Sequence, residues 1–274
     1  MVQNTERLIT SFDNGAIKYD EDTKTFHHKI ANHVIKKHLL LILNGNKNWK
    51  ILDSGGGTSK YSIWLKKLGY NVHLSDISSR SIEIASRKIE KLGLDLPLSN
   101  NDSEKTLFKN SFFDFVMLNG AVISYTQNPE KLLKEANRIL KINGQIFFDF
   151  FNSLGWAFEN ENLKNKVEMA NEDEKLIQMS DWDYPARVMS IKKIEIRLNN
   201  AGFRIINEMG LICLSHTLPL NIRYSNNIER SLIEKYKDIE FELSKDKGCV
   251  GSAWSCIINA EKIAEQQLQP DSAF

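Results

Sequence analysis

Short apolar runs alternate with helix-like segments between residues 49 and 151, and this alternation limits the possible folds more than any other feature. The intervening segments carry apolar residues at helical spacing and end at glycine or at asparagine–glycine. Alternating strands and helices predict a parallel sheet with helices on both faces. The strands are expected at 49–53, 72–76, 96–98, 113–118 and 145–151. Because Pro97 cannot donate a backbone hydrogen bond, its strand should lie at a sheet edge.

The rest of the chain adds strands and helices to this sheet. Residues 5–44 are expected to be mostly helical, and another helix is expected at 190–201. The last two strand candidates lie at 203–214 and 253–260. We therefore expect an α/β fold with a doubly wound, mostly parallel sheet of seven strands, helices on both faces and the last strand antiparallel. We expect residues 1–274 to form a single domain.

A glycine-rich loop follows the first expected strand, where sheets of this kind bind ligands. From Asp53 to Thr58 the sequence is DSGGGT, and three consecutive glycines permit a close approach of a ligand to the backbone. A dinucleotide-binding loop needs Gly-x-Gly-x-x-Gly, and here Lys60 occupies the third glycine position. Asp53 would repel a pyrophosphate but suits S-adenosylmethionine, which carries an ammonium and a sulfonium. A tight turn that binds no ligand is the alternative.

Asp76 ends the second expected strand. A carboxylate there can accept hydrogen bonds from both hydroxyls of a ribose. Alternatively, it stabilises the dipole of the helix that begins near Ser79. We favour the ribose role because the glycine loop precedes it, and we expect the carboxylate at the open edge of the sheet.

The stretch ILDSGGGTSKYSIWLKKLGYNVHLSDIS resembles the first two motifs of class I S-adenosylmethionine-dependent methyltransferases. The resemblance continues through NDSEKTLFKNSFFDFVMLNG, NPEKLLKEANRILKING and QIFFDFFN, so it covers residues 49–151, and the turn at Ala201-Gly202-Phe203 also matches. The sequence departs from the family at Ser59, where a glycine is usual, and at Asn143-Gly144-Gln145, where Pro-Gly-Gly is usual.

The resemblance implies a role for particular residues. The glycine loop would hold the methionine part of the cofactor, and Asp76 would hold the ribose. Asp102 and Ser103 would contact the adenine, with Ile77 packed on the ring. Asn119 and Gly120 would lie beside the sulfonium, and Phe12 and Tyr19 would belong to a lid. The expected cofactor-binding residues are Tyr19, Asp53, Gly55, Gly56, Gly57, Thr58, Asp76, Ile77, Asp102, Ser103, Asn119 and Gly120.

The same resemblance divides the domain into functional segments. Residues 1–45 would form a helical lid, and 46–151 the cofactor-binding core. Two long segments, 152–189 and 215–248, exceed what short connections need and are expected to be substrate-lid insertions. Their aromatic residues favour either an acceptor pocket or a small satellite core. The candidate substrate-binding residues are Trp182, Tyr184 and Tyr224.

Methyl transfer needs a general base only when the acceptor must lose a proton. His216 is the candidate catalytic residue because it follows the sixth expected strand, although a lone histidine is more often structural. His73 should be structural, and the four histidines between 27 and 38 should face solvent.

Composition and charge argue against several classes of protein: those that bind nucleic acid, membranes or metals, and secreted proteins. A net charge of +1 gives no field that would attract nucleic acid or an anionic membrane. No segment has the length of a membrane span, and the N-terminus has no apolar core of signal-peptide length. Three widely spaced cysteines without a CxxC pair indicate reduced thiols, a cytoplasmic location and no metal site.

These observations predict a methyltransferase that uses S-adenosyl-L-methionine and methylates a small molecule. One alternative is a catalytically silent module that binds S-adenosylmethionine and regulates a partner. A nicotinamide-dependent oxidoreductase is a weaker alternative, because Asp53 and Lys60 do not fit a dinucleotide loop.

Overall fold

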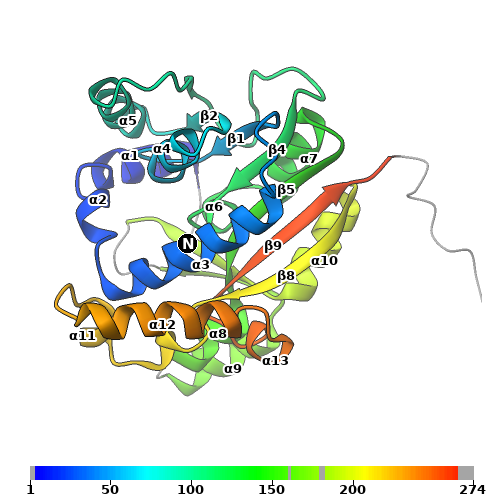
Figure 1. Cartoon of the computed structure of the whole chain (residues 1–274). Helices are drawn as coiled ribbons and strands as arrows, with labels where there is room; N and C mark the ends of the chain where they lie inside the picture. The colour runs from blue at the N-terminus through cyan, green and yellow to red at the C-terminus, as the bar shows by residue number, and fades with distance from the viewer. Residues whose placement is uncertain (1–3, 160–161, 179–182, 265–274) are drawn as a thin grey trace, which may run out of the picture.

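A central sheet organises the computed structural model, which describes residues 4–159, 162–178 and 183–264 (Figure 1). Within these residues nine strands pair in one sheet. They are β1 Lys50–Ser54, β2 Asn71–Asp76, β3 Leu98–Asn100, β4 Phe113–Leu118, β5 Leu140–Asn152, β6 Glu174–Gln178, β7 Pro185–Met189, β8 Phe203–Leu211 and β9 Ser255–Lys262. Strands β3, β2, β1, β4 and β5 are parallel in that order. The last strand, β9, is antiparallel to both β5 and β8, as predicted.

The expected count of seven strands is too low by the two strands of a hairpin. Strands β6 and β7 pair with each other antiparallel, and β7 runs parallel to Phe151 and Asn152 at the end of β5. The hairpin lies in the first insertion, where no period-two pattern marked it. The edge strand is confirmed but begins two residues late, at Leu98; the carbonyl of Pro97 accepts a hydrogen bond from the Leu74 N–H at 2.9 Å.

Helices cover both faces of the sheet, as predicted. On one face, α3 Phe26–Leu43, α4 Lys60–Lys67 and α12 Arg230–Leu243 pack over Ile51, Phe115 and Phe147. On the other, α7 Pro129–Ile139 and α10 Ile191–Asn200 pack over Val116 and Phe148. The strand residues under the two helix layers alternate, as Phe115 and Val116 do along β4, because successive residues of a strand point to opposite faces.

Capping residues fix where the core helices begin. The Ser78 Oγ accepts a hydrogen bond from the Ser81 N–H at 3.0 Å and starts α5 Ser79–Lys91, as predicted. Asn128 caps α7 in the same way, with Pro129 at the first position. A short helix, α6 Val122–Tyr125, follows β4.

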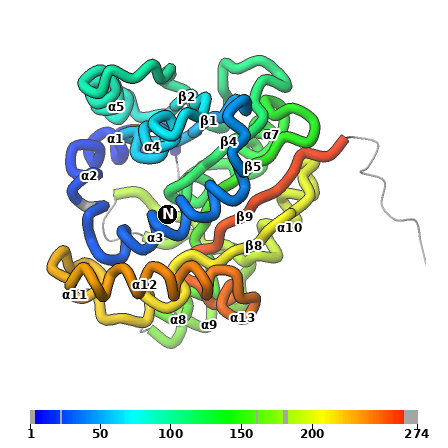
Figure 2. Tube along the Cα trace, viewed as in Figure 1, coloured from blue at the N-terminus to red at the C-terminus, as the bar shows by residue number. Residues whose placement is uncertain are grey.

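The N-terminal segment is helical, as predicted, and lies beside the carboxyl ends of the strands. It comprises α1 Thr5–Gly15, α2 Tyr19–Asp22 and α3. Figure 2 traces it from α1 and α2, close to α5, into α3, which runs across the sheet. The expectation that its histidines face solvent is wrong for two of them: His27 and His38 are buried, because both lie on the packed face of α3.

The two insertions carry the remaining helices. They are α8 Ser153–Glu159, α9 Leu163–Asn171, the 3₁₀ turn η1 Ser215–Thr217, α11 Leu220–Arg223, α12 and α13 Lys247–Val250. The Arg223 guanidinium joins the insertions, because it donates to Glu159 Oε1 at 2.7 Å. Within the described part of the chain, no helix is both long and apolar enough to cross a membrane.

Candidate active site

The glycine loop leaves β1 in a conformation that only glycine fits. Gly55 has φ of +73°, and a Cβ there would lie 2.6 Å from Val122 Cγ2. A Cβ on Gly56 would lie 2.1 Å from Leu74 Cδ1. Gly57, in contrast, borders open space. Ser59 has φ of +78°, the left-handed conformation that explains why the family usually has glycine there.

Asp76 lies between the glycine loop and the start of α5. Its Oδ2 accepts the Gly57 N–H at 2.8 Å, and its Oδ1 accepts the Ser78 N–H at 2.8 Å. The side chain is 7% exposed, so the expectation of an open-edge carboxylate is wrong. Burial raises the pKa of its carboxyl to about 6, although the two N–H groups lower it.

The loop after β3 lies against the end of β1. Ser103 Oγ is 2.8 Å from Ser54 Oγ, and Asp102 Oδ1 accepts the Glu104 N–H at 2.8 Å. Burial raises the pKa of Asp102. This loop therefore stands beside Asp76, at the same edge of the sheet.

An unpaired amide lies at the end of β4. The Asn119 side chain is 6% exposed, and neither its Oδ1 nor its Nδ2 has a hydrogen-bond partner among the described residues. The adjoining turn is held by Asp149 of β5, whose two oxygens accept the Gly120 N–H at 2.7 Å and the Ala121 N–H at 3.0 Å. Burial raises the pKa of Asp149 to about 6. A buried amide without partners indicates that a ligand completes its hydrogen bonds.

Tyr19 reaches this turn from the N-terminal segment. Its hydroxyl is 3.9 Å from the position of a Cβ on Gly120. Burial, followed by the charges of Asp149 and Asp76, holds the pKa of this phenol above its ordinary value. Tyr19 therefore closes over the carboxyl ends of β2, β4 and β5.

Two carboxylates fasten the N-terminal segment at the site. Asp20 Oδ1 accepts the Thr58 hydroxyl at 2.7 Å, and the same carboxylate pairs with Lys88 of α5. Asp13 Oδ1 accepts the Ser78 hydroxyl at 2.6 Å and the backbone N–H of residue 80 at 3.1 Å. The segment is thus bonded to the glycine loop and to the start of α5.

These features surround one cavity of about 1100 Å³. The structure brings together most of the residues that the sequence singled out. Those that line the cavity are Tyr19, Gly55, Gly57, Thr58, Asp76, Ile77, Asp102, Ser103, Asn119, Gly120 and Tyr224. Both insertions contribute lining residues, among them Trp156 and Tyr224.

Four of the predicted site residues do not line the cavity. Asp53 points away from it, since its Oδ2 accepts the Ser62 hydroxyl at 2.5 Å, and burial raises its pKa to about 7. Gly56 packs on Leu74. His216 is buried in η1 with Nδ1 3.1 Å from the Ile212 carbonyl oxygen. Tyr184 is fully buried in the cluster around Val188. Trp182 lies outside the described residues.

Among the lining residues that the sequence did not predict are Asp149, His27 and Lys60. Asp149 had a signal, a single carboxylate inside an otherwise apolar strand. His27 and Lys60 had none, because their orientation depends on how α3 and α4 pack. Lys60 Nζ donates to Asn32 Oδ1 at 3.0 Å, and burial lowers its pKa to about 8.

A continuous series of aromatic rings forms one side of the cavity. Its centroid separations include 5.4 Å for Phe12 and Tyr125, 5.7 Å for Tyr125 and Phe151, and 5.1 Å for Phe151 and Trp254. The rings of this connected series that line the cavity, called here the aromatic wall, are Phe12, Tyr125, Phe151, Trp156, Trp254, His27 and Tyr224. The first insertion thus supplies both a satellite core, around Tyr184, and part of this wall.

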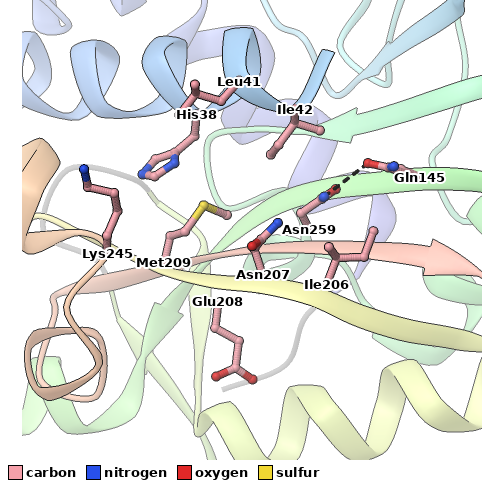
Figure 3. A pocket seen from close by; sticks show the side chains of 10 residues that line it. All are labelled: His38, Leu41, Ile42, Gln145, Ile206, Asn207, Glu208, Met209, Lys245 and Asn259. Atoms are coloured by element: carbon pink, nitrogen blue, oxygen red, sulfur yellow. Dashed lines mark hydrogen bonds between the residues drawn. The ribbon is translucent and has the colours of Figure 1, made fainter. Parts of the chain in front are cut away.

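A second, smaller groove of about 430 Å³ lies between α3, β8 and β9 (Figure 3). There Asn259 Nδ2 donates to Gln145 Oε1 at 3.1 Å, as the dashed line marks. None of the predicted site residues lines this groove. The candidate active site is therefore the larger cavity.

Comparison with known proteins agrees with this geometry. The family model described as a methyltransferase domain matches residues 52–148. A ubiquinone/menaquinone biosynthesis C-methyltransferase of Chromobacterium violaceum is 34% identical over 119 residues, which are 42% of this chain and 48% of that protein. Over the residues that these comparisons match, this chain is thus similar to methyltransferase domains. It matches about half the length of this curated relative.

Solved structures show the same fold. A methyltransferase of Thermotoga maritima has a TM-score of 0.61 at 17% identity, covering 93% of this chain and 99% of that one. A geranyl diphosphate C-methyltransferase of Streptomyces coelicolor, solved with S-adenosyl-L-homocysteine, has a TM-score of 0.55 at 15% identity, covering 84% and 79%.

The site fits S-adenosylmethionine, the cofactor that the sequence predicts. The unpaired Asn119 amide offers a donor and an acceptor, and open space beside Gly57 admits a ligand to the backbone. Carboxylates at Asp76 and Asp149 suit a ligand with net positive charge.

Proposed function

We propose that this protein is a methyltransferase that transfers the methyl group of S-adenosylmethionine to an uncharged small molecule. The observation that carries the proposal is the shared cavity, which is lined both by Gly57, Asp76 and Asn119 and by the aromatic wall. Its volume of about 1100 Å³ is large for one small ligand, so it has room for cofactor and acceptor together.

The residues at the strand ends would hold the cofactor. Asp76 would accept the ribose hydroxyls with the lone pairs that Gly57 and Ser78 leave free. Asp102 and Ser103 would contact the adenine against Ile77. The glycine loop, from Asp53 to Thr58, would hold the methionine part, with Asp53 acting from behind the loop as a counter-charge.

When bound, S-adenosylmethionine supplies a methyl group already activated by a sulfonium. The protein then needs to align the acceptor and exclude water. Asn119, Gly120 and Tyr19 would lie beside the sulfonium. Asp149 fixes the turn after Asn119, because it accepts the N–H groups of Gly120 and Ala121. Tyr19 would cover the cofactor and keep bulk water out.

The charges that line the cavity argue against an anionic acceptor. The carboxylates that line the cavity are Asp76, Asp102, Glu104, Asp149 and Glu159, and the lining lysines are Lys18 and Lys60. An anionic acceptor would therefore meet an excess of negative charge. The name of the Chromobacterium relative, a methyltransferase of quinone biosynthesis, also supports a small organic acceptor.

Turnover tests the proposal. The protein should release S-adenosylhomocysteine when it is incubated with S-adenosylmethionine and a panel of phenols, aromatic amines and aliphatic alcohols. We expect S-adenosylhomocysteine to be released in the presence of at least one phenol or amine and not in the absence of an acceptor. Cofactor binding without turnover on a broad panel would instead favour the silent regulatory module.

A further inference from the structure

His27 is a buried polar group with an unmet hydrogen bond inside the cavity. It is the second residue of α3 and is 3% exposed. Its Nδ1 has no hydrogen-bond partner among the described residues, although the ring lines the cavity. The other buried histidine of this helix, His38, differs in both respects: its Nε2 lies 2.7 Å from Ser244 Oγ, and it lines the groove of Figure 3.

Aromatic rings surround His27 on two sides. The Tyr224 ring is stacked on it, with centroids 5.9 Å apart and an interplanar angle of 25°. The Trp254 ring meets it edge to face at 5.0 Å and is itself stacked on Trp156 at 5.1 Å. Flat ligands fit best where such ring faces and edges are already in place.

The charges around His27 favour its neutral form. Burial first, then His28, Arg223 and His216, hold the pKa of its imidazole well below the ordinary value. The neutral ring has one donor and one acceptor nitrogen. The charged residue nearby that lines the cavity is Glu159, which pairs with Arg223.

The lysines that line the cavity lie elsewhere in it. Of the two lining lysines, Lys60 bonds to Asn32 and faces Tyr19, and Lys18 directly precedes Tyr19 in the chain. Among the described residues, the charged one that lines the aromatic wall is Glu159. Its charge is balanced by Arg223, whose guanidinium carbon lies 5.8 Å from the centroid of the Tyr224 ring, so the wall offers a ligand no net charge.

We propose that the aromatic wall is the acceptor subsite, that it takes a flat, uncharged aromatic molecule, and that His27 forms a hydrogen bond with the hydroxyl or amino group of that molecule. The inference rests on the proposed function, because the methyl donor must bind beside this subsite. It makes His27 a residue of acceptor specificity and assigns it no role in cofactor binding.

Three matched probes test the subsite: 2-naphthol, 2-methylnaphthalene and 2-naphthoate, titrated calorimetrically at pH 7.5 into protein saturated with S-adenosylhomocysteine. The first two have nearly the same shape and differ in the hydrogen bond. We expect 2-naphthol to bind about 3–10-fold more tightly than 2-methylnaphthalene, the scale of one such bond. We expect 2-naphthoate to bind at least tenfold more weakly than 2-naphthol.

Substitutions then assign the hydrogen bond. H27L should weaken 2-naphthol about 3–10-fold and change 2-methylnaphthalene less than twofold, a difference that a general packing defect would not produce. H38L is the matched control and should change neither. Y224L alters a half-exposed ring and should weaken both probes, which keeps the wall testable should H27L fail to fold.

The outcomes separate this inference from the proposed function. Failure of the wild-type protein to bind S-adenosylhomocysteine would overturn the proposed function. Normal binding of S-adenosylhomocysteine with equal affinity for all three probes, or with equal losses for both naphthalenes in H27L, would overturn only the assignment of the aromatic wall and His27.

Discussion

Asp76 accepts hydrogen bonds from both the glycine loop and the start of α5, so its removal should affect binding and stability together. D76A should weaken S-adenosylhomocysteine binding by about 1–3 kcal/mol, because charge-assisted hydrogen bonds to the ribose are lost. It should also lower the free energy of unfolding by about 1–3 kcal/mol, since the Gly57 and Ser78 N–H groups lose their acceptor. Calorimetry and denaturant unfolding measure the two effects.

The exposed carboxylate Asp95, just after α5, provides the control. D95A should leave both quantities unchanged. Unaltered affinity in D76A, together with reduced stability, would mean that Asp76 serves only the helix end.

The buried carboxylates also predict a pH dependence. Burial raises the pKa of Asp76 and Asp149 to about 6 and that of Asp53 to about 7. A raised carboxyl pKa contributes stability that is complete below pH 4 and is lost as the pH rises through 6–7. The ligand-free protein should therefore lose thermal stability between pH 5 and pH 7.5 on account of these groups.

Binding of S-adenosylmethionine should oppose this loss of thermal stability at higher pH. S-adenosylmethionine brings positive charge to carboxylates that are ionised at pH 7.5 and largely protonated at pH 5. The rise in melting temperature that it causes should therefore be larger at pH 7.5. S-adenosylhomocysteine lacks the sulfonium and should show a smaller pH effect; equal pH effects for the two ligands would contradict this account.

At the residue level, the local sequence pattern predicted where the site residues lie better than it predicted which way their side chains point. The glycine loop, Asp76, Asn119 and Gly120 could be placed because a parallel sheet gathers the ends of its strands at one edge. Asp53 and His27 could not be oriented: which way each faces depends on the packing of α4 and α3. His216 follows the predicted strand, yet the η1 turn carries its ring toward the Ile212 carbonyl.

At the level of elements, α2 should control exchange of the cofactor, because Asp20 bonds it to Thr58 and Lys88. D20A should speed the release of S-adenosylhomocysteine by roughly fivefold, the scale of about 1 kcal/mol in lost contacts. Thermal stability should change little, since the carboxylate is partly exposed. Stopped-flow displacement measures the rate.

The neighbouring Glu21 gives a control within the same helix. Its carboxylate pairs with Lys24 at 2.6 Å, away from the glycine loop. E21A should leave the release rate unchanged. Equal acceleration in both variants would mean that loss of helix α2, rather than loss of the Asp20 bonds, governs release.

Element type followed from periodicity wherever an apolar run was long or a cap was clear, as at Ser78 and Asn128. The hairpin of β6 and β7 was missed for a physical reason. Both strands are short, β6 is partly exposed, and β7 is buried at four of its five residues, so neither has an alternating pattern. They are held by pairing with each other and with the end of β5.

For the molecule as a whole, three segments far apart in sequence meet over one sheet edge. The N-terminal segment and the two insertions all contribute to the same cavity. The bond between Arg223 and Glu159 joins the insertions, and the Asp13 and Asp20 contacts join the N-terminal segment to the core. We propose that these segments and the sheet therefore unfold as a single cooperative unit.

Thermal unfolding with and without ligand tests this unit. At a free concentration of 100 times Kd, S-adenosylhomocysteine should stabilise the protein by about 2.7 kcal/mol. For a chain of 274 residues that corresponds to a rise in melting temperature of roughly 5 °C, because the unfolding entropy grows with length. NAD at the same concentration should cause no shift, since the loop around Asp53 and Lys60 does not suit a pyrophosphate. Two transitions, of which only one responds to S-adenosylhomocysteine, would show instead that the segments over the cavity fold separately from the cofactor-binding sheet.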